Sequence, residues 1–292
     1  MLQSRPVIAT QEPSGREPPG ASARERLSVV LAVKNEARQI RECVAQLDFA
    51  DEVVVVDMQS TDGTAEIARD LGHRVIVHDG GPHGLIHANK NAGFDAAGGP
   101  WILNLDADER LTIELRDEIL AVLRSPDPEV AAYSLPFTHY FFGKYLRHGG
   151  FRGSLVRLFR KGKLRYPEDR AHSTPIIDGK VGELRNLVVH FNHRSIAEFV
   201  AKMNLYTSQD APLLVARGRG GLRNRPLPRN LGLKLFTAPL SVFWNRYVRH
   251  AGFLDGAHGF VAAVLLAGYQ LVEYAKAWEA IHVRPEGEEE PA

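Results

Sequence analysis

The chain has 292 residues, of which 44% are hydrophobic and 24% charged, so its composition is that of a globular protein with one large domain, or one domain and an appendage. Lysine and arginine (36) nearly balance aspartate and glutamate (35), so the overall charge favours no class of partner. The single cysteine, Cys43, excludes an internal disulfide and a metal site built from several cysteines.

Both ends of the chain differ in composition from its centre. Residues 1–26 are rich in Pro, Gly, Ser, Arg and Glu and contain almost no large apolar side chains, and we expect them to be disordered. These residues also lack the long apolar stretch of a secretory signal peptide, so we expect a cytoplasmic location. Residues 284–292 are predicted to form a frayed acidic tail.

Apolar runs alternate with helical patterns from residue 27 to residue 105. Continuous apolar runs separated by amphipathic helices indicate a parallel sheet covered on both faces. Ligands of such sheets bind at the carboxyl ends of the strands, where Asp57 and Asp106 lie. Residues 34–37 read Lys-Asn-Glu-Ala, which excludes a dehydrogenase-type dinucleotide turn, and no P-loop is present. The strands are predicted at residues 27–33, 52–57, 74–77 and 101–105, and the helices at residues 36–47, 61–71 and 86–97.

An acidic pair, Asp106 and Asp108, follows the fourth predicted strand. Carboxylates at positions i and i+2 of an extended chain point the same way, and a divalent cation relieves their repulsion. Mg²⁺ takes one or two carboxylates and completes its shell with substrate phosphates and water. The pair therefore predicts a site for a metal-bridged diphosphate. The alternative is that the acidic pair has no ligand and only precedes the next helix, with Thr112 as the cap.

The region from residue 130 to residue 193 is predicted to be rich in strands, and a helix is predicted at residues 195–209, with Ser195 and Glu198 as a capping box. His190 and His193 are interpreted as packing or hydrogen-bonding residues, because no third metal ligand is near them in the sequence.

The composition changes again near residue 217. Six cations and no acid fall within residues 217–234, and an apolar helix is predicted at residues 235–248. A second apolar segment, residues 260–272, is shorter than the ~20 residues that span a bilayer. Together they indicate an element that lies on an anionic membrane surface. A buried helical hairpin with a solvated basic loop is the alternative. The cations are Arg217, Arg219, Arg223, Arg225, Arg229 and Lys234, and the aromatic residues of the first helix are Phe236, Phe243, Trp244 and Tyr247.

Four segments, in order along the chain, resemble the inverting family 2 glycosyltransferases with the GT-A fold, and within that family the lipopolysaccharide core β-glucosyltransferases. The resemblance extends over roughly residues 27 to 280. It implies a Rossmann-like α/β fold with a mixed, mainly parallel sheet flanked by helices, here followed by a helical membrane-interface element. The segments are residues 29–37 (VVLAVKNEA), 53–64 (VVVVDMQSTDGT), 89–91 (NKN) and 105–110 (LDADER).

The resemblance implies a nucleotide pocket at the ends of the first two strands. Asp57 would receive the base, since a carboxylate at a strand end accepts a hydrogen bond from a pyrimidine N–H. Asn35 and Glu36 would edge the pocket, and Ser60 would shape its loop. We expect Asp62 to cap the helix that follows.

The resemblance also implies roles for the acidic pair and for the third helix. Lys90 and Asn91 would face the nucleotide. Asp106 would contact the ribose or the metal, and Asp108 would coordinate Mg²⁺ or Mn²⁺ bridging the diphosphate. The metal would act as a Lewis acid that offsets charge on the leaving group.

Inversion requires a base that takes the proton from the acceptor hydroxyl, and a carboxylate is the usual choice. Related enzymes carry Val-His-Glu in the strand-rich half, where residues 171–173 of this chain read Ala-His-Ser. Ser173 cannot replace a glutamate as base. Asp169 is the predicted base and Glu168 the alternative; the other interpretation is that both only pair with neighbouring arginines.

The sequence therefore predicts a membrane-associated inverting glycosyltransferase. It would move a hexose from a nucleoside diphosphate sugar, with a UDP-hexose as the expected donor, to a lipid-linked or lipopolysaccharide-core acceptor; no nucleic acid partner is expected. A polyprenyl phosphate acceptor and a non-catalytic nucleotide-binding membrane scaffold remain alternatives. The catalytic domain is expected at residues 27–210, with the nucleotide sugar bound by 27–110 and the acceptor by 111–210, and the basic and helical region at 211–283.

Overall fold

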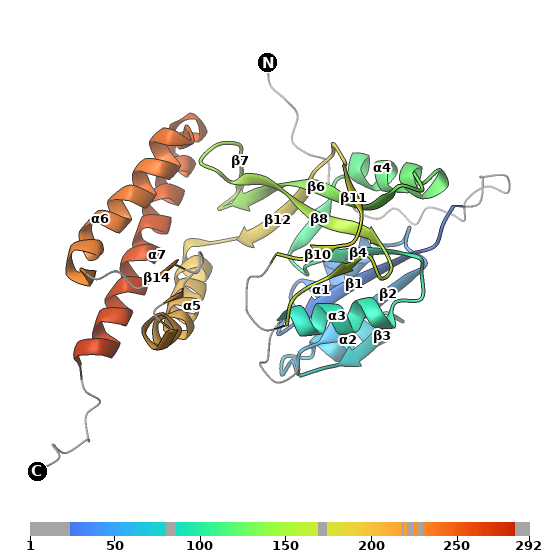
Figure 1. Cartoon of the computed structure of the whole chain (residues 1–292), viewed down its shortest axis with the longest axis horizontal. Coiled ribbons are helices and arrows are strands. Elements are labelled where there is room, and N and C mark those ends of the chain that lie inside the picture. The colour runs from blue at the N-terminus through green and yellow to red at the C-terminus, as the bar shows by residue number, and fades with distance from the viewer. Residues whose placement is uncertain are drawn as a thin grey trace, which may run out of the picture. The chain divides into compact units, whose positions relative to one another are not determined.

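The computed structural model describes residues 24–79, 86–168, 174–217, 219–220, 225–226 and 230–283 (Figure 1). The acidic tail and residues 1–23 of the expected N-terminal segment lie outside the described residues, as do Asp169, Ser173, Arg223 and Arg229. The chain forms two compact units, of which the first comprises Met1–Thr138 and Gly153–Phe191 and the second His139–Arg152 and Asn192–Ala292. The units thus divide the chain differently from the boundary expected at residue 210.

The first unit is built on parallel strands in its N-terminal half. The central strand is β1 (Leu27–Val33), and its neighbours β2 (Glu52–Asp57) and β4 (Trp101–Leu105) run parallel to it. Beyond β2 lies β3 (Arg74–Val77), also parallel. Every residue of β1 and β4 is buried, as continuous apolar runs require when helices cover both faces. The strand predictions are confirmed. The helices of this half are α1 (Ile40–Ala45), α2 (Thr64–Asp70), α3 (Ile86–Ala96) and α4 (Ile113–Arg124).

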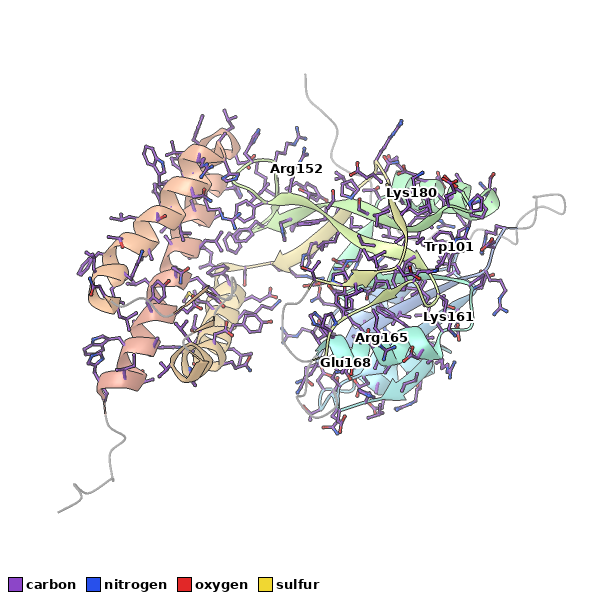
Figure 2. The ribbon with its side chains drawn as sticks, in the orientation of Figure 1. Trp101, Arg152, Lys161, Arg165, Glu168 and Lys180 are labelled. Carbon is purple, nitrogen blue, oxygen red and sulfur yellow. The ribbon has the colours of Figure 1, made fainter. Side chains whose placement is uncertain are left out.

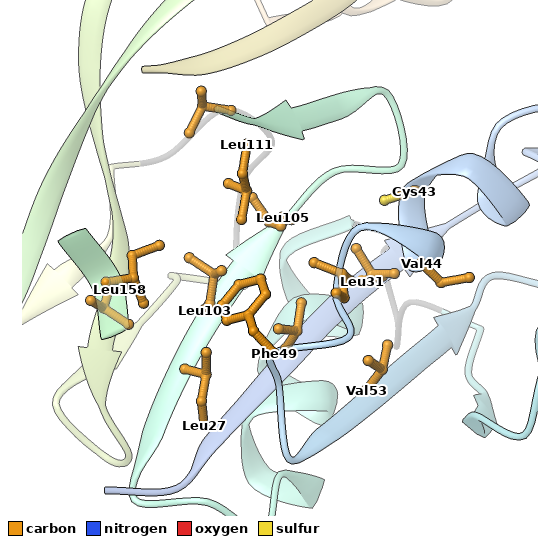
Figure 3. Packing of buried hydrophobic residues seen from close by; sticks show 14 of the residues in the cluster. Leu27, Leu31, Cys43, Val44, Phe49, Val53, Leu103, Leu105, Leu111 and Leu158 are labelled. Atoms are coloured by element: carbon orange, nitrogen blue, oxygen red, sulfur yellow. The ribbon is translucent and has the colours of Figure 1, made fainter. Parts of the chain in front are cut away.

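Alternate residues of the strands enter two separate cores. Leu31 and Leu103 lie in a large cluster with side chains of α1, α2 and α4 (Figure 3). Cys43 of α1 is part of this cluster, and burial raises the pKa of its thiol to about 12, so it is a packing residue. Val30 lies in the second cluster, which is closed by Phe94 of α3. The sheet is therefore covered on both faces, as predicted.

Helix α3 approaches the sheet closely at Gly93. A Cβ atom at this position would lie 2.4 Å from Cγ1 of Val30 and 2.8 Å from Cγ2 of Val56. Both valines are fully buried and have no room to move. The glycine thus lets α3 lie directly on β1 and β2, which fixes the height of its polar residues above the sheet.

The sheet continues beyond β4 in mixed directions, in the order β3-β2-β1-β4-β8-β6-β12-β5, with β7 and β11 paired to β6. The pairings of β8 with β4 and of β12 with β5 are antiparallel. The expected α/β class, a mixed sheet flanked by helices, is confirmed. The further strands are β5 (Glu109–Leu111), β6 (Val130–Phe141), β7 (Lys144–Leu146), β8 (Arg152–Arg160), β9 (Leu164–Arg165), β10 (Ile176–Ile177), β11 (Lys180–Glu183) and β12 (Val188–His193).

The second unit is mainly helical. Two of its helices, Ile196–Arg217 and Ala257–His282, are longer than predicted, whereas Leu231–Trp244 begins and ends four residues before the predicted 235–248. The predicted cap of α5 is present: the Glu198 N–H donates to Ser195 Oγ at 3.1 Å. The elements are α5 (Ile196–Arg217), β13 (Arg219–Gly220), β14 (Arg225–Pro226), α6 (Leu231–Trp244), the π-helical turn η2 (Asn245–Arg249), the 3₁₀ turn η3 (Gly252–Asp255) and α7 (Ala257–His282).

Helix α7 corrects the expectation of a segment too short to span a membrane. It has 26 residues, and by length and composition alone it is long and apolar enough to cross a bilayer. The core helix of a soluble protein passes the same test. In this unit α7 has a packing role, since Ala262 and Tyr269 pack with Phe199 of α5, and Tyr274 packs with Leu231 of α6.

Candidate active site

The loops that follow β1 and β2 are joined by hydrogen bonds at the carboxyl ends of the strands. The Asn35 N–H donates to Ser60 Oγ at 2.9 Å, and the Thr61 N–H returns a bond of 2.9 Å to Asn35 Oδ1. The Glu36 N–H donates to Thr64 Oγ1 at 2.8 Å. Asn35 has φ 57°, in the left-handed region that non-glycine residues seldom adopt. The structure therefore brings together the residues expected to edge the nucleotide pocket.

The N-cap position of α2 is Gly63, so Asp62 does not occupy the cap itself as predicted, but it binds the first N–H of the helix from the residue before. Its carboxylate accepts from the Thr64 N–H at 3.1 Å, at the start of α2, and from the Ala37 N–H at 3.0 Å. These backbone hydrogen bonds, together with one from the Thr64 hydroxyl, outweigh desolvation and lower the pKa of Asp62. The residue holds the two loops at a fixed separation.

Asp57 lies between these loops at the end of β2, and its side chain is 2% exposed. Oδ2 accepts from the Ser60 N–H at 3.0 Å. Oδ1 is buried and has no hydrogen-bond partner among the described residues. A buried carboxylate oxygen without a donor is costly, so this position is suited to a ligand that brings an N–H group.

Asp106 is held by two cations. Oδ1 lies 2.8 Å from Lys90 Nζ of α3, and Oδ2 lies 2.8 Å from Arg157 Nη2 of β8. Arg157 also lies 2.6 Å from Glu109 Oε1. Although burial acts to raise it, the pKa of Asp106 is well below its usual range because the charges of Arg157 and Lys90 stabilise the carboxylate. The repulsion between acids that the sequence suggested is thus relieved in part by protein cations.

Asp108 has a different neighbour. Its Oδ1 lies 3.0 Å from Nε2 of His190, and the side chains are 17% and 23% exposed. His190 is brought there by β12, which pairs with β5 so that His190 faces Glu109. Burial lowers the pKa of His190, but the hydrogen bond and charge of Asp108 prevail and raise it. Within the part of the chain that the structure describes, no group of three or more His, Cys, Asp or Glu side chains is placed to hold a metal.

The donor atoms at Asp108 nevertheless fit a divalent cation. The carboxylate supplies an oxygen ligand of the kind these ions prefer, and substrate phosphates and water commonly complete the shell of Mg²⁺ or Mn²⁺. Asp106 fits the role less well, because Lys90 and Arg157 already occupy both of its oxygens. Sequence reasoning assigned no role to Arg157 and took His190 for a packing or hydrogen-bonding residue, and its contact with Asp108 agrees with the second interpretation. Only the strand pairings bring these side chains to the acidic pair, and they involve residues far apart in the chain.

Lys90 and Asn91, which were expected to face the nucleotide, are 7% and 1% exposed. Lys90 pairs with Asp106, whereas Asn91 donates from Nδ2 to Glu168 Oε1 at 2.6 Å. Glu168 also lies 3.3 Å from Arg165 Nη2, on the segment after β9 (Figure 2). A direct nucleotide contact by Lys90 or Asn91 stays a prediction, as does the basic function of Asp169 or Glu168.

Comparison with known proteins adds the following similarities. The family model described as Glycosyl transferase family 2 matches residues 28–181. The chain is 30% identical over 268 residues to the lipopolysaccharide core biosynthesis glycosyltransferase LpsC of Rhizobium meliloti, covering 89% of this chain and 95% of that protein. It is 28% identical over 270 residues to an uncharacterized glycosyltransferase of Rickettsia felis, covering 88% and 91%. Among solved structures, the mannosyltransferase PcManGT from Pyrobaculum calidifontis, in complex with GDP-Man and Mn²⁺, has a TM-score of 0.44 at 18% identity, with 89% of each chain covered.

Proposed function

This chain belongs to glycosyl transferase family 2 and is a glycosyltransferase, and on that premise we propose that it moves a hexose, with inversion, from a nucleoside diphosphate sugar to a lipid-linked or lipopolysaccharide-core acceptor. The observation that supports the choice of sugar donor is the buried Oδ1 of Asp57, which accepts no hydrogen bond from the described residues. A pyrimidine base brings an N–H to such an oxygen, so UDP-hexose is the proposed donor. The relative from Rhizobium meliloti supports the acceptor class.

The reaction assigns distinct roles to the residues at the strand ends. Asp108 would hold Mg²⁺ or Mn²⁺ together with the donor diphosphate, His190 lies beside it, and Asp106 would contact the ribose. When bound, the metal offsets charge on the departing diphosphate. Asp169 would take the acceptor hydroxyl proton as its oxygen attacks the anomeric carbon. The bond to the diphosphate oxygen then breaks, and its electron pair leaves with the nucleoside diphosphate.

The test is a donor screen with Mn²⁺ and total membrane lipid, which detects released nucleoside diphosphate. We expect nucleoside diphosphate to be released from one of the donors, and we expect this release to depend on lipid. A radiolabelled lipid product distinguishes a lipopolysaccharide-core acceptor from polyprenyl phosphate. Binding of nucleotide without turnover on any donor would favour the non-catalytic scaffold.

The assignment of Asp57 makes a separate prediction. Asp57→Ala should weaken nucleoside diphosphate binding by about 1.5–3 kcal/mol, the scale of a hydrogen bond to a charged group. Calorimetry on the folded variant measures this directly. The matched control is Glu66→Ala, which removes an exposed carboxylate on α2 and should leave the affinity unchanged. Equal affinities of Asp57→Ala and the unmodified protein would exclude Asp57 as the residue that reads the base.

We also propose that the second unit docks on the anionic inner face of the membrane. Residues 211–254 contain no aspartate or glutamate but eight cations. On α6, four large apolar side chains follow each other at helical spacing and are each at least 60% exposed, which is unusual for a soluble surface. The four are Leu233, Phe236, Leu240 and Trp244. The cations are Arg217, Arg219, Arg223, Arg225, Arg229, Lys234, Arg246 and Arg249.

The exposed row on α6 differs from the aromatic set expected from the sequence. Phe243 and Tyr247 pack on the ring of Phe260 of α7, with ring centroids 5.8 and 5.6 Å apart. Of the four expected aromatic residues, therefore, Phe236 and Trp244 are the two whose exposed side chains would contact lipid. Trp is well suited to the interface between headgroups and acyl chains.

Liposome sedimentation tests this membrane docking. Each cation near an anionic surface contributes about 1 kcal/mol, so high salt should release the protein in part. Reversing Arg223, Arg225 and Arg229 to Glu should release it further, whereas Lys180→Glu, an exposed cation of the first unit, should have little effect.

The apolar contribution is tested with Phe236→Ser and Trp244→Ser together, against Leu155→Ser as the matched exposed residue of the first unit. The double variant should bind anionic vesicles more weakly, and Leu155→Ser should not. Equal and negligible binding of the unmodified protein to anionic and neutral vesicles would rule out the docking surface.

A further inference from the structure

Three consecutive residues of α3 hold three different segments of the first unit. Asn89 Oδ1 lies 2.9 Å from Nδ1 of His78, just after β3. Lys90 Nζ lies 2.8 Å from Asp106 Oδ1, just after β4. Asn91 Nδ2 donates to the carbonyl oxygen of Tyr166 at 2.8 Å, just after β9. Successive side chains of a helix point about 100° apart, so one turn of α3 reaches all three segments.

Asn91 binds both backbone groups of Tyr166. In addition to its bond to the carbonyl oxygen, its Oδ1 accepts from the Tyr166 N–H at 3.0 Å. The side-chain amide thus pairs with Tyr166 as a neighbouring strand would. The ring of His87 stacks on the Tyr166 ring at 4.5 Å with an interplanar angle of 14°. Tyr166 is therefore held on α3 through its backbone and through its side chain.

The same side-chain amide also binds Glu168. Nδ2 of Asn91 also donates to Glu168 Oε1, and Asn91 is 1% exposed, so water does not compete for the site. These contacts need an amide: a carboxylate at residue 91 would lose both donated bonds and would face the carboxylate of Glu168. The segment that they hold is the last described part of the chain before Asp169.

We propose that Asn91 is a positioning residue, which fixes the segment leading to Asp169 relative to Asp106 through the adjacent Lys90. The proposal rests on the proposed function, because Asp169 carries the base role only there. It replaces the direct nucleotide contact that the family resemblance implied for Asn91. Since Gly93 seats α3 tightly on β1 and β2, the helix is a rigid support for this arrangement.

The test compares three variants with the unmodified protein: Asn91→Asp, Glu168→Gln and the two combined. Asn91→Asp should slow sugar transfer on the order of 10- to 100-fold at saturating donor, the scale of a lost hydrogen bond to a charged group. Its affinity for nucleoside diphosphate should stay unchanged. Glu168→Gln keeps an oxygen that accepts the bond from Asn91, so hydrogen exchange over residues 164–168 should stay near that of the unmodified protein. In the double variant, the amide introduced at residue 168 can donate to the new carboxylate at residue 91, so transfer should recover by about tenfold over Asn91→Asp.

Hydrogen–deuterium exchange over residues 164–168 tests the positioning without turnover. Exchange should rise in Asn91→Asp and fall again in the double variant. The proposal is overturned if Asn91→Asp weakens nucleotide binding as much as it slows transfer, or if the double variant recovers neither transfer nor protection. If the unmodified protein transfers no sugar while the exchange follows this pattern, the positioning by Asn91 stands and the proposed function fails.

Discussion

Asp108→Asn should lower glycosyl transfer by ~10²–10³-fold, because a neutral amide replaces the carboxylate that we propose as the ligand of the divalent cation. Asp108 is suited to this role because its carboxylate is an oxygen ligand of the kind these ions prefer and follows the carboxyl end of β4. The Mn²⁺ dependence of transfer should shift to higher concentration in the variant. Mn²⁺ binding in the presence of nucleoside diphosphate, followed by electron paramagnetic resonance, measures the same loss without turnover.

Asp106→Asn is the informative comparison. Its carboxylate is held by Lys90 and Arg157, so removing the charge takes this partner from the poorly exposed Lys90 and leaves Arg157 with Glu109. Breaking one member of such a network destabilises the fold, and the melting temperature should fall. Asp108→Asn should melt near the unmodified protein. Near-normal turnover and metal dependence in Asp108→Asn would defeat the assignment of the metal to this residue.

The parallel half of the sheet could be predicted from the sequence because its central strands are fully buried. A buried parallel strand reads as an unbroken apolar run, as in Val53 to Val56, and its neighbours along the chain are also its neighbours in the sheet. Asp57 and Asp106 could be placed at strand ends for the same reason. The helix ends were less predictable, since the C-terminal parts of α5 and α7 are buried through Leu214, Tyr274 and Ala277, in a cluster of residues far apart in the chain.

The surroundings of the acidic pair could not be predicted, because they depend on pairings between distant strands. Arg157 reaches Asp106 because β8 pairs antiparallel with β4, with Leu158 opposite Leu103. His190 reaches Asp108 because β12 pairs with β5. A single sequence carries no signal for such contacts beyond the unusual presence of Arg157 in an apolar strand. The resemblance to the family proposed Asp57 and Asp108 as site residues but gave no indication of the protein groups that surround them.

The last prediction concerns the base. If Asp169 takes the proton from the acceptor hydroxyl, Asp169→Asn should lower the rate of transfer by ~10²–10⁴-fold, because the amide cannot accept a proton. Binding of nucleoside diphosphate, measured by calorimetry, should be unaffected. Glu168→Gln is the matched variant, and it should be mild because the glutamine oxygen still accepts the bond from Asn91. A severe loss in Glu168→Gln with a mild effect in Asp169→Asn would transfer the role to Glu168. Mild effects in both variants would show that neither carboxylate is the base, and that the proton leaves the acceptor by way of another group.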